Sequence, residues 1–179
     1  MQLLRGAILG QYEAAEPSQI ATAECVIGHS FGTSVGPGSV NARLGSLAAF
    51  WAEATDTPLI VDHVLAKALP EGAPEPVAVT KGKISTTTGG GLETWGTYLR
   101  AEEYMAHHYL WNPIVVAQAF LAVRAARQAT KLGMKPILPS GLPHQFDPHA
   151  EKQDWTHSRS AWIRRELVGV FVLKAQGRL

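Results

Sequence analysis

Short apolar runs separated by longer amphipathic segments dominate the pattern of this chain. Five such runs predict buried strands, at residues 24–28, 58–62, 76–80, 113–118 and 135–139. In the run at 113–118, isoleucine and two valines follow one another without alternating polar residues, as in a parallel strand that is covered on both faces. We therefore expect that strand to be central in a parallel sheet.

Amphipathic segments between these runs predict the helices. After a glycine-rich loop, apolar residues recur with the helical period of 3.6 residues at Val40, Leu44, Leu47, Ala48 and Trp51. Ser39 is the expected N-cap of that helix. Further helices are expected over 63–69, from residue 92, over 119–132 with Gly133 as its C-cap, and over about 157–175.

Two of these helices have predicted inner faces. The helix from residue 92 is expected to bury Leu92, Trp95, Tyr98, Leu99, Met105, Ala106 and Tyr109. The last helix is expected to bury Trp162, Ile163, Leu167, Val170 and Phe171. Residues 81–91 show no apolar periodicity and are predicted to form a loop. The alternation of strands and helices predicts an α/β fold, with a mostly parallel sheet and helices on both of its faces.

Composition sets limits on the class of protein. With 179 residues, of which 46% are hydrophobic and 17% charged, the chain is expected to form one domain over residues 1–179. The net charge of +1 disfavours a nucleic-acid partner, because such proteins concentrate lysine and arginine. The single Cys25 cannot form an internal disulfide. No apolar stretch approaches the roughly 18 to 20 residues of a membrane span, so a cytoplasmic protein is expected, with its oligomeric state open.

The loop after the first strand contains the pattern G-x-S-x-G, formed by Gly28, Ser30 and Gly32. Serine hydrolases use this pattern to present a nucleophile on a sharp turn between a strand and a helix. In those enzymes several strands precede the turn, whereas here only one does. A serine hydrolase that uses Ser30 is therefore the third of our hypotheses.

The same glycines have a second interpretation. They let the backbone approach a ligand, and ligands of open parallel sheets bind outside the carboxyl ends of the strands. Backbone N–H groups of this loop, which includes His29, together with the start of the next helix would suit an anion. The loop lacks the G-x-G-x-x-G spacing, which disfavours NAD.

Several segments follow one another in the order of a known family. The strand ending at Gly28 precedes a helix that carries Arg43, and Ser85 and Thr94 match polar positions further along. Residues 113–134 match a strand, a short turn and a helix that carries an Arg-Ala pair, here at Arg124. In this order the chain resembles the YdcF-like family, which includes SanA and ElyC, over about residues 24–179.

The resemblance implies a Rossmann-like three-layer sandwich. It also implies a nucleotide-like ligand, since S-adenosylmethionine is associated with one branch of the family. The chain departs from the family at polar positions: Asp62 and His63 replace Gly-Gly, Gly82 replaces a glutamate, and Leu121 replaces a histidine. These departures favour a second hypothesis, a binding or regulatory protein that retains the fold without the chemistry.

Candidate site residues follow from these arguments. Asp62 and His63 end the second strand, where an acid–base pair could act, and Glu93 begins a helix after three glycines. Either Asp62 or Glu93 could instead serve a helix terminus. The expected ligand-binding residues are Gly28, His29, Ser30, Gly32, Arg43, Ser85, Thr94 and Arg124. The histidines are irregularly spaced and lack cysteine pairs, so no metal site is expected.

The first hypothesis is a protein that binds an anionic or nucleotide-like molecule at the carboxyl edge of the sheet. If the protein is an enzyme, the expected reaction is transfer or hydrolysis at a phosphate-containing group. Asp62, His63 or Glu93 would then move the protons.

Overall fold

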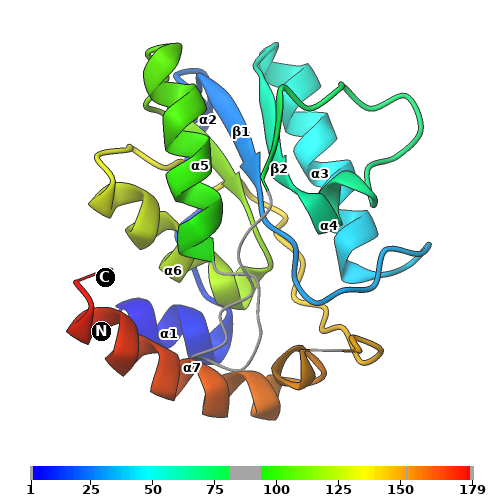
Figure 1. Ribbon diagram of the computed structural model, residues 1–179, viewed down its shortest axis with the longest axis vertical. Coiled ribbons are helices and arrows are strands. Elements are labelled where there is room, and N and C mark those ends of the chain that lie inside the picture. The colour runs from blue at the N-terminus through cyan, green and yellow to red at the C-terminus, as the bar shows by residue number, and fades with distance from the viewer. Residues whose placement is uncertain (1, 81–93, 152, 178–179) are drawn as a thin grey trace.

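A parallel sheet lies at the centre of the protein (Figure 1). The computed structural model describes residues 2–80, 94–151 and 153–177. The strands are in the order β3-β2-β1-β4, and all three pairings are parallel. Their bounds are β1 (Cys25–Gly28), β2 (Leu59–Asp62), β3 (Ala78–Thr80) and β4 (Pro113–Val116). This arrangement confirms the predicted α/β fold, a Rossmann-like three-layer sandwich.

The strands form where the apolar runs predicted them, because β1, β2 and β4 are buried along their whole length. The predicted fifth strand is reduced to one parallel bridge between Ile114 and Ile137. Ile137 donates to Pro113 O and accepts from the N–H of Val115, both at 2.8 Å. Pro136 and Pro139 flank this bridge, and proline has no N–H with which to continue a ladder. On its outer edge, β4 therefore pairs only with the backbone N–H and C=O of Ile137 among the described residues.

Helices cover both faces of the sheet. The connections from β1 to β2 and from β2 to β3 contain α3 and α4, which lie on one face (Figure 1). α5, in the connection from β3 to β4, and α6, which follows β4, lie on the other face. The bounds are α1 (Gln2–Leu9), α2 (Pro17–Ile20), α3 (Val40–Thr55), α4 (His63–Ala66), α5 (Thr94–His107), α6 (Ala119–Lys131) and α7 (Arg159–Ala175), with a 3-10 turn η1 (Asp154–Thr156). Within the described ranges, no helix is long and apolar enough to cross a bilayer.

Capping residues explain where two helices begin and where a third ends. The predicted cap Ser39 accepts a hydrogen bond from the N–H of Ala42 at 3.1 Å, and α3 starts at the next residue. Gly133 follows α6 with φ of 82°, a left-handed conformation that glycine adopts without strain. Ser158 caps α7 in the same way as Ser39 caps α3.

The inner face of α5 differs from the prediction. Tyr98 and Met105 are buried as expected, but Leu99 is 46% exposed, Tyr109 is 82% exposed, and Ala106 also faces outward. The buried stripe instead combines apolar and polar residues, at Thr94, Thr97, Tyr98, Ala101 and Met105. Two threonines contribute to this face, so a search for apolar residues alone misplaced it. Leu92 and the side chain of Trp95 lie outside the described residues.

A similar correction applies to α7, where Leu167 was expected inside but is 41% exposed. The buried positions are Trp162, Glu166 and Val170, four residues apart along the helix. Ile163 is half-buried, and the side chain of Phe171 lies outside the described part. Because the inner position between Trp162 and Val170 carries the charged Glu166, apolar periodicity alone does not reveal this stripe.

Candidate functional site

The strand order reverses beside β1. The chain moves from β1 to β2 and β3 on one side, and then returns to β4 on the other side of β1. In open parallel sheets, ligands bind in the crevice outside the carboxyl ends of the strands at such a switch point. The loop after β1 and the start of α6 meet there, and α7 packs against the loop through Trp162, whose ring centroid lies 5.2 Å from that of Phe31.

The ends of three neighbouring strands bring polar side chains into one row. Gly28 pairs with Val61, and Asp62 pairs with Thr80, so His29, Asp62 and Thr80 occupy equivalent positions. Residues at equivalent positions of parallel strands share one face of the sheet. We call these three residues the edge row. The sequence predicted two of them, His29 and Asp62, as site residues. The register between β2 and β3 adds Thr80.

His29 and Tyr98 are buried against each other at this edge. Their ring centroids lie 4.6 Å apart in an edge-to-face arrangement. Burial, and secondarily the positive charge of Arg124, lowers the pKa of His29 to about 3, so its imidazole is neutral near pH 7. Burial also raises the pKa of Tyr98 well above its usual value. Both groups therefore offer neutral hydrogen-bonding atoms.

Four buried polar atoms at the ends of the strands and on α5 have no hydrogen-bond partner among the described residues. They are His29 Nε2, His63 Nδ1, Thr80 Oγ1 and Tyr98 OH. Most buried polar groups in folded proteins are paired with protein or with water, so each unpaired group needs a specific explanation. The rings of His29 and Tyr98 lie 4.6 Å apart, so one polar ligand beside them would supply a partner to both.

Asp62 has a structural role in this arrangement. Its Oδ2 accepts from the N–H of Ser30 at 2.6 Å, and its Oδ1 accepts from the N–H groups of Val64 and Leu65 at 2.9 and 3.0 Å. The carboxylate thus caps α4 and fixes the start of the loop after β1. This is the helix-capping role that was the alternative to acid–base chemistry.

The N–H groups of the loop after β1 are occupied by side chains of the protein itself. Asn41 Oδ1 accepts from the N–H of Phe31 at 2.8 Å. Asp147 Oδ2 accepts from the N–H groups of Thr33 and Ser34, each at 2.9 Å, and Asp147 Oδ1 accepts from Ser34 Oγ at 2.6 Å. The anion that this loop binds in the structure is therefore the carboxylate of Asp147.

The two glycines of the G-x-S-x-G pattern are explained by packing. A Cβ on Gly28 would lie 2.5 Å from Leu65 Cδ2, and a Cβ on Gly32 would lie 2.1 Å from Asp147 Oδ2. Gly32 also has φ of 78°, which favours glycine. Ser30 is half-buried, and no histidine in the described chain hydrogen-bonds its hydroxyl. Among the described residues, the hydrogen-bonded base that a serine nucleophile needs is not present beside Ser30.

Arg124 and Glu166 form a buried ion pair beside this site. Arg124 Nε lies 2.9 Å from Glu166 Oε1, with the two side chains 18% and 4% exposed. The guanidinium also lies over the ring of Trp162, 5.6 Å from its centroid. Burial raises the pKa of Glu166, while Arg124 and then Arg165 oppose this shift. The sequence indicated Arg124 but not its partner.

The remaining predicted residues lie in different places. Arg43 is exposed on α3, where it lines a surface groove of about 570 Å³ with Gly38, Phe50 and Pro143, and no edge-row residue lines that groove. Thr94 is buried at the start of α5. Ser85 and Glu93 lie outside the described residues. Within the described ranges, no three histidine, cysteine or acidic side chains are grouped as a metal site would require.

Comparison with known proteins found no matching family model, no matching curated protein and no matching solved structure. Function is therefore inferred from the geometry of the site.

His29 predicts a specific loss of stability at acid pH. The unfolded chain takes up a proton on this imidazole near pH 6.5, and the folded protein does so only near pH 3. Between these values the unfolded state binds more protons, so the free energy of unfolding falls as the pH is lowered, by up to roughly 1.4 kcal/mol per pH unit. Above pH 6.5 the effect vanishes.

Urea unfolding of the wild type and of His29→Phe, at pH 7.5 and pH 5.0, tests this expectation. Phenylalanine keeps an aromatic ring against Tyr98 but cannot titrate. Burial raises the pKa of Glu166, so protonation of this carboxylate favours the folded state as the pH falls. This contribution is common to both proteins, and the comparison therefore uses the difference between their losses. The wild type should lose roughly 2 kcal/mol more than the variant between these pH values. An equal loss would contradict a neutral, buried His29.

Proposed function

We propose that the protein binds a small anionic, nucleotide-like molecule at the carboxyl edge of its sheet, in the cytoplasm. One observation carries the proposal: His29 Nε2 and Tyr98 OH are buried without partners beside the switch point of the strand order. Small-molecule sites place a few polar groups of this kind in an otherwise apolar environment. The ligand would satisfy both atoms and remove the cost of burying them unpaired.

The charges at the edge define the class of ligand. A neutral imidazole and a neutral phenol can both donate and accept, which suits a heterocycle or a ribose hydroxyl. Arg124 uses Nε on Glu166, and its other guanidinium donors would be available to a phosphate or carboxylate. The N–H groups of Thr33 and Ser34 are held by Asp147, so the anion would bind to Arg124 rather than to the loop.

The geometry favours binding over turnover. Asp62 is committed to three backbone N–H groups, and the low pKa of His29 makes it a weak base near neutral pH. Transfer or hydrolysis at a phosphate would have to depend on His63 or Glu93 instead. We propose that the protein is a divergent YdcF-like binding protein. Support for that family comes from the parallel sheet and from Arg124 at its carboxyl edge.

Substitution of Tyr98 by phenylalanine tests this function. Removing the unpaired hydroxyl should raise the free energy of unfolding of the ligand-free protein by about 1 kcal/mol, and it should weaken ligand binding about tenfold. Stability would be measured by urea unfolding. Ligands would be found by thermal shift among nucleotides, S-adenosylmethionine and sugar phosphates, and their affinity would be measured by calorimetry.

Tyr109→Phe provides the matched control, because Tyr109 follows the same helix but is 82% exposed. It should change neither stability nor affinity. The proposal fails if no compound in the panel shifts the wild type. It also fails if Tyr98→Phe binds the identified ligand as tightly as the wild type does.

A further inference from the structure

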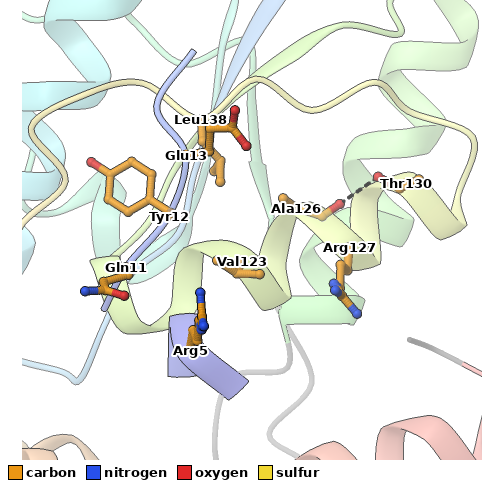
Figure 2. Close-up of a pocket in the computed structure, with 9 residues that line it drawn as sticks. All are labelled: Arg5, Gln11, Tyr12, Glu13, Val123, Ala126, Arg127, Thr130 and Leu138. Carbon is orange, nitrogen blue, oxygen red and sulfur yellow. Dashed lines mark hydrogen bonds between the residues drawn. The ribbon is translucent and has the colours of Figure 1, made fainter. Parts of the chain in front are cut away.

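A cavity of about 540 Å³ lies between α1, the segment after it and α6 (Figure 2). Apolar atoms of Val123, Ala126 and Leu138 line part of it, and the remaining lining comes from Arg5, Gln11, Tyr12, Glu13, Arg127 and Thr130. No edge-row residue lines this cavity. Its volume falls within the range of about 300 to 1,000 Å³ that is typical of small-molecule sites.

Close packing and backbone bonds form the walls. A Cβ on Gly6 would lie 2.5 Å from Val123 Cγ2, so glycine lets α1 approach α6 closely. The extended segment that follows is fixed where the N–H of Ala15 donates to Leu138 O at 2.8 Å. Tyr12 OH accepts from the N–H of Leu142 at 3.0 Å, which holds its ring in place. The packing of α1 on α6 and these two hydrogen bonds therefore fix the positions of the cavity walls.

One stripe of α6 supplies the opposite wall. Val123, Ala126, Arg127 and Thr130 follow the i, i+3, i+4, i+7 spacing, so they lie on one side of the helix. Arg124 and Gln128 lie on other sides, and Arg124 is paired with Glu166. The same helix therefore presents one arginine to its buried ion pair and a second arginine, Arg127, to this cavity.

The charges of the lining favour an anion. Arg5 and Arg127 come from different helices, and neither forms an ion pair with any acidic side chain in the described ranges. Glu13 lines the cavity from the side of the extended segment, away from both guanidinium groups (Figure 2). Two arginines against one glutamate leave a surplus of one positive charge. Guanidinium groups bind carboxylates and phosphates through paired hydrogen bonds.

We propose that this cavity binds a small organic anion, a carboxylate or a phosphate ester with an apolar body. The anionic group binds Arg5 and Arg127, and the apolar body packs on Val123, Ala126 and the ring of Tyr12. This site is separate from the one proposed at the carboxyl edge of the sheet, and it does not depend on that function.

Titration of the ¹⁵N-labelled protein with phenyl phosphate and with benzoate tests the proposal, and neutral benzyl alcohol serves as the matched probe without charge. At least one of the anions should shift the amide signals of residues 11–13 and 123–130 at millimolar concentration or below. Arg5→Gln and Arg127→Gln should each weaken its affinity about tenfold. Arg164→Gln, an exposed arginine on α7, should leave the affinity unchanged.

Two further variants make the outcome decisive. Ala126→Phe fills the cavity and should abolish binding of the anion while the protein stays folded, because Ala126 is only partly buried. Tyr98→Phe should leave the affinity unchanged, which separates this site from the one at the sheet edge. A preference for phenyl phosphate or for benzoate identifies the anionic group. Binding of neither anion, equal binding of benzyl alcohol, or an affinity that survives both arginine substitutions would overturn the proposal.

Discussion

Glu166→Ala is expected to lower the free energy of unfolding by roughly 3 kcal/mol. The carboxylate is 4% exposed and forms an ion pair of 2.9 Å with Arg124, which is itself only 18% exposed. Without it, the guanidinium would be left with its charge uncompensated beside His29 and the ring of Trp162. Breaking a buried pair by removing one partner typically costs about 3 to 5 kcal/mol. We take the lower value because Arg124 retains some contact with solvent.

The double variant Arg124→Met, Glu166→Leu separates the lost charge balance from lost packing. Apolar residues of similar length should recover most of the stability, since a buried ion pair can often be replaced without loss. Leu167→Ala, at the exposed neighbouring position, is the control and should cost little. Urea unfolding measures all three. If the double variant is as unstable as Glu166→Ala, the pair itself does not explain the loss.

The fold was predictable because its strands are buried on both faces and leave continuous apolar runs. Residues 58–62 and 113–118 show this directly, and Ser39 marks the start of α3 by its cap. Glu166 and Thr97 were not predictable in this way. Each occupies an inner helical position with a polar side chain, and hydrophobic patterning carries no signal for such a residue. Leu167 was assigned to the core instead of Glu166 on α7, and Leu99 was assigned to it on α5, where Thr97 is buried.

The candidate site was predictable only as far as the ends of the strands. Asp62 and His29 were located because each follows an apolar run, and parallel strands share one carboxyl edge. Two features depend on contacts between distant parts of the chain. Asp147 lies 113 residues after Ser34, and Tyr98 meets His29 only once α5 crosses the sheet. The cap that Asp62 provides for α4 was one of the two roles expected from the sequence, and only its bond from the N–H of Ser30 depends on a distant segment.

Asp147→Ala is expected to have an effect at least as large as Glu166→Ala, roughly 3 to 5 kcal/mol of unfolding free energy. The N–H groups of Thr33 and Ser34 and the hydroxyl of Ser34 would lose their acceptor in a part of the structure where Asp147 is buried. A buried donor left unpaired costs about 1 to 3 kcal/mol, and the lower value applies to each of these three donors because Thr33 and Ser34 are half-buried.

Two milder variants determine how this loss arises. Asp147→Asn keeps an oxygen for the two N–H groups and should lose less than half as much stability, and Ser34→Ala removes only the hydroxyl bond and should cost about 1 kcal/mol. Hydrogen exchange at residues 30–36 should become faster in Asp147→Ala and stay close to the wild-type rate in Ser34→Ala. If alanine at 147 leaves both stability and exchange unchanged, the carboxylate does not hold this loop.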